Sequence, residues 1–233
     1  MANSRHLKRT SMPTSWPVQR KIITFIGRPK AGSHKRDYVV STLILLRDVL
    51  KYTHTTKEAK YVVNEQEFLV NGRKITDVKS PIGLFDIVEI PAMKEKFVVL
   101  FNEVGRVKLV PSKDSTVTLK VSNKTKAKGG KFQLNFMNGY NILVDEKTFS
   151  GVSVEDSIEY DFTKKAIVKT YSLKEGSSVY VFDGKYQGSL GVVRGFTKYN
   201  GVTRDTVQVE IEGTVQTTAK DYCYVVADIK RFA

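Results

Sequence analysis

The sequence predicts an α+β chain that is mostly β and is divided into several domains. Helical spacing of apolar residues is confined to residues 38–63. Asn-Gly pairs at 71–72 and 138–139 separate short apolar runs, which is the strongest local signal for a β-hairpin. From Phe97 onward, apolar and polar residues alternate as they do in half-buried strands. A length of 233 residues suits one large domain or two to three small ones, and the hydrophobic content supports real cores.

The composition points to a polyanionic partner. The formal net charge is +14, and 41% of the residues are hydrophobic. Such an excess of cations favours nucleic acid first and an anionic membrane surface second. A single cysteine, Cys223, excludes an internal disulfide and a Cys/His zinc site, and fits a reducing compartment. The three histidines lie far apart, and no apolar run approaches the ~20 residues of a membrane span, so we expect no cofactor, metal or membrane partner.

Residues 1–37 are predicted to form a basic, extended N-terminal arm. The first 36 residues contain nine Lys or Arg and no acid, and Asp37 is the first acidic residue. Trp16 and Phe25 interrupt the charge, as suits contact with RNA phosphates and unstacked bases. We expect an arm that orders on its partner. The alternatives are a solubilising tail, or Trp16 packed onto the core.

Residues 38–96 are predicted to form a small α/β domain. Tyr38 to Tyr52 reads as an apolar helix, on which Arg47 and Lys51 share one face. A second helix begins with the capping-box spacing of Thr55 and Glu58. It leads to the Asn71-Gly72 hairpin, whose tip carries Arg73 and Lys74, and the run 86–90 closes the sheet.

Residues 97–172 are predicted to form a central antiparallel β domain. Its basic segment 124–131 is split by Gly129 and Gly130 and ends at Lys131. This segment lacks the spacing of a nucleotide-binding P-loop. It is either a flexible loop that approaches phosphates or a simple turn.

Residues 173–233 are predicted to form a small β-barrel. The strand 179–182 leads into a loop with Lys185 in which Gly184, Gly188 and Gly191 permit positive φ or close backbone approach. An ordinary glycine-rich turn without a ligand is the alternative. Cys223 alternates with two tyrosines and is expected to be a buried or half-buried strand residue.

Two of these segments resemble known domains. Residues 38–96 resemble the S4-type RNA-binding domain. The residues that match its pattern are Arg47-Asp48-Val49-Leu50, Thr55 with Glu58-Ala59, Leu69-Val70-Asn71-Gly72 and Asp86-Ile87-Val88-Glu89-Ile90. They depart from it where 64–67 lack the usual glycine and where Gly83 is separated from Asp86. The glycine-punctuated strand–loop–strand of residues 179–194 resembles the KOW motif of SH3-like barrels.

The whole order of segments resembles the small-subunit ribosomal protein S4e family. The matching signatures are His6-Leu7-Lys8-Arg9 and Trp16, Gly32 with His34-Lys35, Val70-Asn71-Gly72-Arg73, Gly105-Arg106, Gly129-Gly130-Lys131 and the three loop glycines of the KOW motif. The resemblance implies a structural constituent of the small ribosomal subunit, cytoplasmic and without enzymatic activity. Its partners would be ribosomal RNA and neighbouring ribosomal proteins, with no small-molecule substrate.

Eleven side chains are expected to contact RNA, the cations through phosphates and the two rings through bases or sugars. They are His6, Lys8, Arg9, Trp16, Arg20, Arg47, Lys51, Arg73, Lys74, Lys131 and Lys185.

Three other functions remain open at this point. S4-type domains also accompany RNA-modifying enzymes, although no Rossmann-like glycine pattern or nucleophile–base pair occurs here. A KOW barrel can serve a transcription or translation factor, although the acid-free arm suits a permanent anchor better. Binding to an anionic membrane would need an amphipathic basic helix, which the prolines of the arm disfavour.

Overall fold

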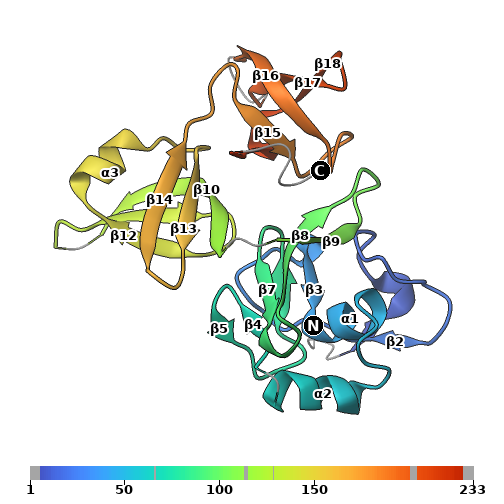
Figure 1. Ribbon diagram of the computed structural model, residues 1–233. Helices are drawn as coiled ribbons and strands as arrows, with labels where there is room; N and C mark the ends of the chain where they lie inside the picture. The colour runs from blue at the N-terminus through green and yellow to red at the C-terminus, as the bar shows by residue number, and fades with distance from the viewer. Residues whose placement is uncertain (1–5, 66, 113–114, 128, 200–203, 228–233) are drawn as a thin grey trace, which may run out of the picture. The chain divides into compact units, whose positions relative to one another are not determined.

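The computed structural model describes residues 6–65, 67–112, 115–127, 129–199 and 204–227. The chain forms two compact units: Met1–Leu100 with Arg106–Ser115, and Phe101–Gly105 with Thr116–Ala233. Most of the described regular structure is β, with few helices (Figure 1). The mostly β character that the sequence predicts is therefore confirmed.

The first unit is built on a five-stranded sheet of order β5-β4-β7-β8-β9 and two two-stranded sheets, β1-β2 and β3-β6. The strands are β1 Leu7–Lys8, β2 Phe25–Ile26, β3 Val39–Ser41, β4 Leu69–Val70, β5 Arg73–Lys74, β6 Pro81–Gly83, β7 Ile87–Ile90, β8 Glu95–Phe101 and β9 Val107–Pro111. The helices are α1 Thr42–Ile44 and α2 Thr56–Glu65, with short 3₁₀ turns at Arg9–Ser11, Arg36–Tyr38 and Pro91–Met93.

The first predicted helix is shorter and less regular than its apolar pattern suggested. Residues 39–41 form strand β3, α1 begins only at Thr42, and Leu45–Val49 continue in a wider π-helical turn. The expected helix over 38–52 is thus wrong at both ends. Residues 39–46 are all buried. A continuous apolar run of this kind indicates full burial, and it does not distinguish a buried strand from a buried helix.

The second helix and the hairpin follow the predicted local chemistry. The Glu58 N–H donates to Thr55 Oγ1 at 3.2 Å, and the Thr55 N–H donates to Glu58 Oε2 at 3.3 Å, which is the predicted capping box. The His54 N–H also donates to Glu58 Oε2, at 2.8 Å, and this bond is the main cause that holds the pKa of Glu58 below its usual range, with the bonds to Thr55 adding to it. Asn71 and Gly72 have φ of 51° and 72°, as a type I′ turn requires, and they join β4 to β5.

The arm and the strands β8 and β9 are both part of the first unit's structure. Strand β1 pairs with β2, and Trp16 is 2% exposed, with its Nε1–H donating to the Val39 carbonyl at 2.7 Å. The structure thus adopts the alternative in which Trp16 packs on the core. Strands β8 and β9, which sequence analysis assigned to the central domain of residues 97–172, extend the sheet of the hairpin beyond β7.

The second unit contains two five-stranded antiparallel sheets, of order β12-β11-β10-β13-β14 and β18-β17-β16-β15-β19. The first contains β10 Thr116–Lys126, β11 Phe132–Phe136, β12 Asn141–Val144, β13 Ser157–Asp161 and β14 Ala166–Tyr171, with helix α3 at Glu146–Gly151. The second contains β15 Ser178–Val181, β16 Leu190–Thr197, β17 Thr206–Ile211, β18 Thr214–Ala219 and β19 Cys223–Val225, with a 3₁₀ turn at Lys220–Tyr222.

The core of the second sheet contains Cys223, as the strand pattern predicted. Its thiol is fully buried among valines of β15, β16, β17 and β19, and burial raises the pKa of Cys223 to about 11. A thiol with this pKa is almost wholly protonated at neutral pH and a poor nucleophile. Cys223 is therefore a packing residue.

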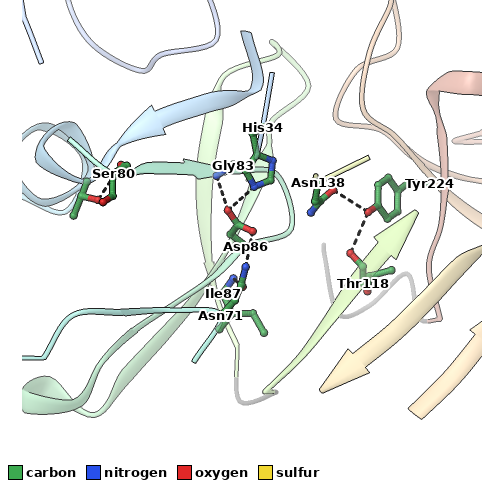
Figure 2. Close-up of polar contacts among 10 residues, drawn as sticks. His34, Asn71, Ser80, Gly83, Asp86, Ile87, Thr118, Asn138 and Tyr224 are labelled. Atoms are coloured by element: carbon green, nitrogen blue, oxygen red, sulfur yellow. Dashed lines mark hydrogen bonds and ion pairs between the residues drawn. The ribbon is translucent and has the colours of Figure 1, made fainter. Parts of the chain in front are cut away.

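Side-chain hydrogen bonds join the two sheets within the second unit. The Tyr224 hydroxyl accepts from the Lys120 N–H at 2.7 Å. It donates to the Thr118 carbonyl at 3.1 Å (Figure 2). The Lys120 ammonium donates to the carbonyls of Asp221 and Cys223 at 2.5 and 2.8 Å. Burial lowers the pKa of Lys120, an effect that the neighbouring Glu155 carboxylate opposes. This cation serves the fold and is not available to a partner.

Candidate nucleic-acid interface

The hairpin of the first unit presents two of the predicted cations to solvent. Arg73 and Lys74 are exposed on β5, directly after the tight turn. Lys74 lies 3.6 Å from Glu67, and both side chains are largely in water, so this ion pair contributes little to stability. An incoming phosphate can therefore replace Glu67 without a large loss.

A buried polar network fixes the base of this hairpin. Asp86 Oδ1 accepts from the Asn71 amide at 2.7 Å, and Asp86 Oδ2 accepts from the Gly83 N–H at 2.8 Å (Figure 2). His34 Nε2 lies 2.7 Å from the same Oδ2. Asn71 Oδ1 in turn accepts from the Ile87 N–H at 2.8 Å. One carboxylate thus connects the arm, the hairpin turn and the loop before β7.

Sequence reasoning did not foresee this network. It read Asn71 as a turn residue and Asp86 as a family signature, but no local spacing relates either of them to His34, which is 52 residues from Asp86. The side chain of His34 is only 5% exposed. A Cβ at Gly83 would lie 2.3 Å from the His34 ring, so the ring needs a glycine there.

The His34–Asp86 pair makes the stability of the first unit depend on pH. Burial by itself lowers the pKa of His34, but the charge of Asp86 and the hydrogen bond to it outweigh burial and raise the pKa above its ordinary value. A histidine with a raised folded-state pKa stabilises the fold fully below its unfolded pKa of about 6.5 and loses that contribution as the pH rises through the folded value.

We therefore expect the unfolding free energy of the wild type to fall as the pH rises above about 6.5 and through the raised folded-state pKa of His34. His34→Gln should abolish that component, and His6→Gln, at an exposed position, should retain it. Urea unfolding at a series of pH values measures this difference. Parallel pH profiles for the wild type and His34→Gln would contradict it.

Three more predicted cations surround a cavity of about 610 Å³ in the first unit. Arg9, Arg47 and Lys51 all line it, together with Thr53 and His54, which sequence reasoning did not single out. The two missed residues lie in the link between the helices, where no periodic pattern marks them. The predicted common helical face of Arg47 and Lys51 is wrong, because the helical turn ends at Val49 and Lys51 lies beyond it with φ of +59°. Both residues nevertheless line the same cavity.

The other predicted residues of the arm are placed differently from one another. His6, Lys8 and Arg20 are exposed, and the His6 ring lies 5.4 Å from that of Phe25. Arg9 is 3% exposed and donates through Nη1 to the Gln19 carbonyl at 2.8 Å. Trp16 is buried, so its ring is not presented for base stacking in this structure.

The second unit presents Lys131 and Lys185, both exposed. Lys131 follows Gly130 immediately before β11, and Lys185 lies in the loop between β15 and β16. Lys124, in the same basic segment as Lys131, instead donates to the carbonyls of Phe149 and Val152. Within that segment, Lys124 therefore stabilises the fold, whereas Lys131 is exposed to water.

The described ranges contain neither a metal-binding cluster nor a membrane-spanning helix. No group of three or more His, Cys, Asp or Glu side chains there is placed to hold a metal ion. None of the helices there is long and apolar enough to cross a membrane.

Comparisons with known proteins agree over almost the whole chain. The family model described as "Ribosomal family S4e" matches residues 93–167, and the RS4NT domain model matches residues 1–37. Small ribosomal subunit protein eS4 of Halobacterium salinarum is 36% identical over 226 residues, covering 96% of this chain and 95% of that protein. The eS4 protein of Methanocaldococcus jannaschii is 35% identical over 231 residues, covering 96% and 94%.

A solved structure shows the same fold. The 30S ribosomal protein S4e of Thermoplasma acidophilum superposes with a TM-score of 0.69 at 23% identity, covering 84% of this chain and 100% of that one. The identities to the eS4 proteins, which extend over nearly full length, show that the chain belongs to the ribosomal protein S4e family.

Proposed function

We propose that this protein is a structural constituent of the small ribosomal subunit that binds ribosomal RNA and supports translation. The observation that carries the proposal is the near full-length similarity to small ribosomal subunit protein eS4. The family is one of ribosomal proteins and not of enzymes. The protein then acts in the cytoplasm, on the ribosome, with ribosomal RNA and neighbouring ribosomal proteins as its partners.

The proposed mechanism is electrostatic and geometric. With a net charge of +14, the protein neutralises RNA phosphates and releases their counterions, so affinity falls steeply with salt. Rigid folded units hold cations at fixed spacings and thereby match the shape of folded RNA. The proposed phosphate contacts among exposed side chains are Lys8, Arg20, Lys51, Arg73, Lys74, Lys131 and Lys185.

The proposal includes the finer domain assignment. Residues 38–96 act as an S4-type RNA-binding domain, which the confirmed capping box and hairpin support. Residues 173–233 act as a KOW barrel, supported by the positive φ of Gly184 and Gly188 and by the five-stranded sheet of β15 to β19. Residues 1–37 act as the basic arm, and residues 97–172 as the central β segment.

Sedimentation of the tagged protein from its own cells tests the function. We expect stoichiometric migration with the small subunit that survives a moderate salt wash. Migration at the top of the gradient would overturn the proposal in favour of a transient factor.

The same gradient tests the hairpin. Arg73→Gln with Lys74→Gln should leave the subunit at lower salt than the wild type, because two phosphate contacts are lost. With purified protein and RNA, the slope of log affinity against log salt should become shallower by about 1.5. The matched control is Lys164→Gln with Lys165→Gln, which removes two exposed cations from the β13–β14 turn. Equal effects of the two pairs would mean that total charge, and not the hairpin, sets the affinity.

A further inference from the structure

The two-stranded ribbon of β1 and β2 has a buried face and a face in water. In its ladder Leu7 lies opposite Ile26, and Lys8 lies opposite Phe25. Successive residues of a strand point to opposite faces, and residues directly opposite each other share a face. Leu7 and Ile26 are 5% and 7% exposed, so their face is turned toward the core. Lys8 and Phe25 therefore share the outer face, where both are exposed.

A second ring lies beside Phe25 on this ribbon. His6, which immediately precedes β1, is exposed, and the centroid of its ring is 5.4 Å from that of Phe25, at an interplanar angle of 48°. Phe25 remains 52% exposed in spite of this contact. The outer face thus presents two neighbouring rings, with the Lys8 cation directly across the ladder from one of them.

The ribbon is held in place by contacts within the protein. Its inner pair, Leu7 and Ile26, is buried, and the Arg9 N–H donates to the Thr24 carbonyl at 3.0 Å, just beyond the ladder. The Arg9 guanidinium donates to the Gln19 carbonyl at 2.8 Å. The outer side chains are therefore mounted on an ordered backbone, and a partner that binds them does not have to order that backbone first.

Large apolar side chains are concentrated in water at this part of the chain. Ile22 and Ile23 are 63% and 53% exposed, and with Phe25 they place three such side chains within four consecutive positions. Exposed apolar groups that occur singly need no explanation, whereas grouped ones mark interaction sites. We therefore searched the surrounding charge for the chemistry of a partner.

The surrounding charge is entirely positive in the local sequence. Arg20 and Lys21 are exposed immediately before Ile22, and residues 1–36 contain no acidic side chain. A partner that covers this surface should therefore be anionic and should also carry flat apolar groups. Unstacked RNA combines the two, because its phosphates pair with cations and its bases stack on aromatic side chains.

We propose that His6, Lys8 and Phe25 form a stacking platform for one unstacked base of the bound RNA. The base lies on the Phe25 ring with His6 at its side, and a neighbouring phosphate meets the Lys8 ammonium. This inference rests on the proposed function and specifies the kind of RNA feature that is bound, a looped or bulged nucleotide. Trp16 is buried, so the stacking expected of that ring is assigned to Phe25 instead.

Phe25→Leu tests the platform in the full chain. The substitution keeps an apolar side chain and removes the ring, so affinity for small-subunit ribosomal RNA should fall about 10-fold. The slope of log affinity against log salt should not change, because no charge is removed. The midpoint of thermal unfolding should stay close to that of the wild type, since the buried pair of the ribbon is untouched. Phe25→Trp restores a ring and should bind at least as tightly as the wild type.

Lys8→Gln and Phe196→Leu are the companion variants. Lys8→Gln removes the cation of the platform and should make the salt slope shallower by about 0.7, the value for one phosphate of single-stranded nucleic acid. Phe196→Leu makes the same ring-to-leucine change at a partly exposed position on β16 of the second unit. It should leave RNA affinity within twofold of the wild type.

The outcomes separate the platform from the function on which it rests. If the wild type binds ribosomal RNA and Phe25→Leu binds it equally well, the platform is overturned and the proposed function stands. If Phe25→Leu keeps its RNA affinity but leaves the small subunit at lower salt than the wild type, a neighbouring protein covers the ring and the platform is likewise overturned. If the wild type itself does not bind the RNA, the proposed function fails first.

A second experiment observes the stacking directly and does not depend on ribosomal RNA. Titration of the full-length protein with adenosine monophosphate should shift the Phe25 ring protons upfield, because the ring current of a stacked base shields them. The Phe25 signals are assigned by their absence from the spectrum of Phe25→Leu. The shift should be smaller in Lys8→Gln, and inorganic phosphate should not produce it. No upfield shift at millimolar nucleotide, or an equal shift with inorganic phosphate, would overturn the platform.

Discussion

Asp86→Ala is expected to destabilise the first unit by about 3–5 kcal/mol. The Asp86 side chain is 2% exposed and accepts hydrogen bonds from Gly83 and Asn71, and it lies 2.7 Å from His34 Nε2. Its removal leaves three buried polar groups without their acceptor, and each such group is costly. Because Asn71 is in the turn, the loss also loosens the hairpin that carries Arg73 and Lys74.

Chemical denaturation of the full chain, with hydrogen exchange to assign the change to residues, measures this effect. Amides of the hairpin and of Gly83 should exchange faster while those of the second unit keep their protection. Asp77→Ala is the control, since Asp77 is 35% exposed and pairs with Lys30, whose side chain is 64% exposed. It should cost less than about 1 kcal/mol. A cost for Asp86→Ala as small as that of the control would mean that the network does not stabilise the unit.

Gly188→Ala is expected to destabilise the second unit by roughly 3–5 kcal/mol. Gly188 has φ of +86°, which strains any L-residue with a side chain. A Cβ there would also lie 2.2 Å from the Asn102 carbonyl oxygen and 2.8 Å from the Glu103 N–H nitrogen. Both are backbone atoms, so they cannot move aside as a flexible side chain would.

Gly176→Ala separates these two causes. Gly176 has nearly the same φ, +82°, but a Cβ there meets nothing within 4 Å. Its replacement should cost only about 1–2 kcal/mol, the conformational part alone. Thermal unfolding of the two variants beside the wild type gives the comparison. Similar losses for both would show that the chain segments at Gly188 and Asn102 are not held in close contact.

The features that were predicted correctly depend on interactions within a few residues. The capping box needs only Thr55 and Glu58 three positions apart. The type I′ turn needs only residues that tolerate positive φ at 71 and 72. Cys223 lies in an apolar run typical of a strand, and residues 223–226 are all buried. In each case the physical cause lies inside the window in which the pattern was read.

The features that were missed depend on residues far apart in the chain. Arg9 was expected to be a free member of a basic arm, yet it donates to Gln19. For Trp16 the sequence left RNA contact and packing on the core both open, and its bond to Val39 belongs to the packed arrangement. The strands β8 and β9 alternate as any strand does, and the pattern does not say which sheet they join. Whether a side chain that was expected to contact RNA is exposed or buried therefore depends on packing between distant segments. Residue type alone could not predict it.

The sequence by itself determined the family, the excess of positive charge, the mostly β character and the local geometry of the hairpin and the second helix. Only the tertiary structure decided which cations face water, that Asp86 connects His34 to the hairpin, and that Arg9 and Thr53 meet at one cavity. The physical reason is that composition and short-range hydrogen bonding are properties of neighbouring residues. Burial and polar partners at long range exist only after the chain has brought distant segments together.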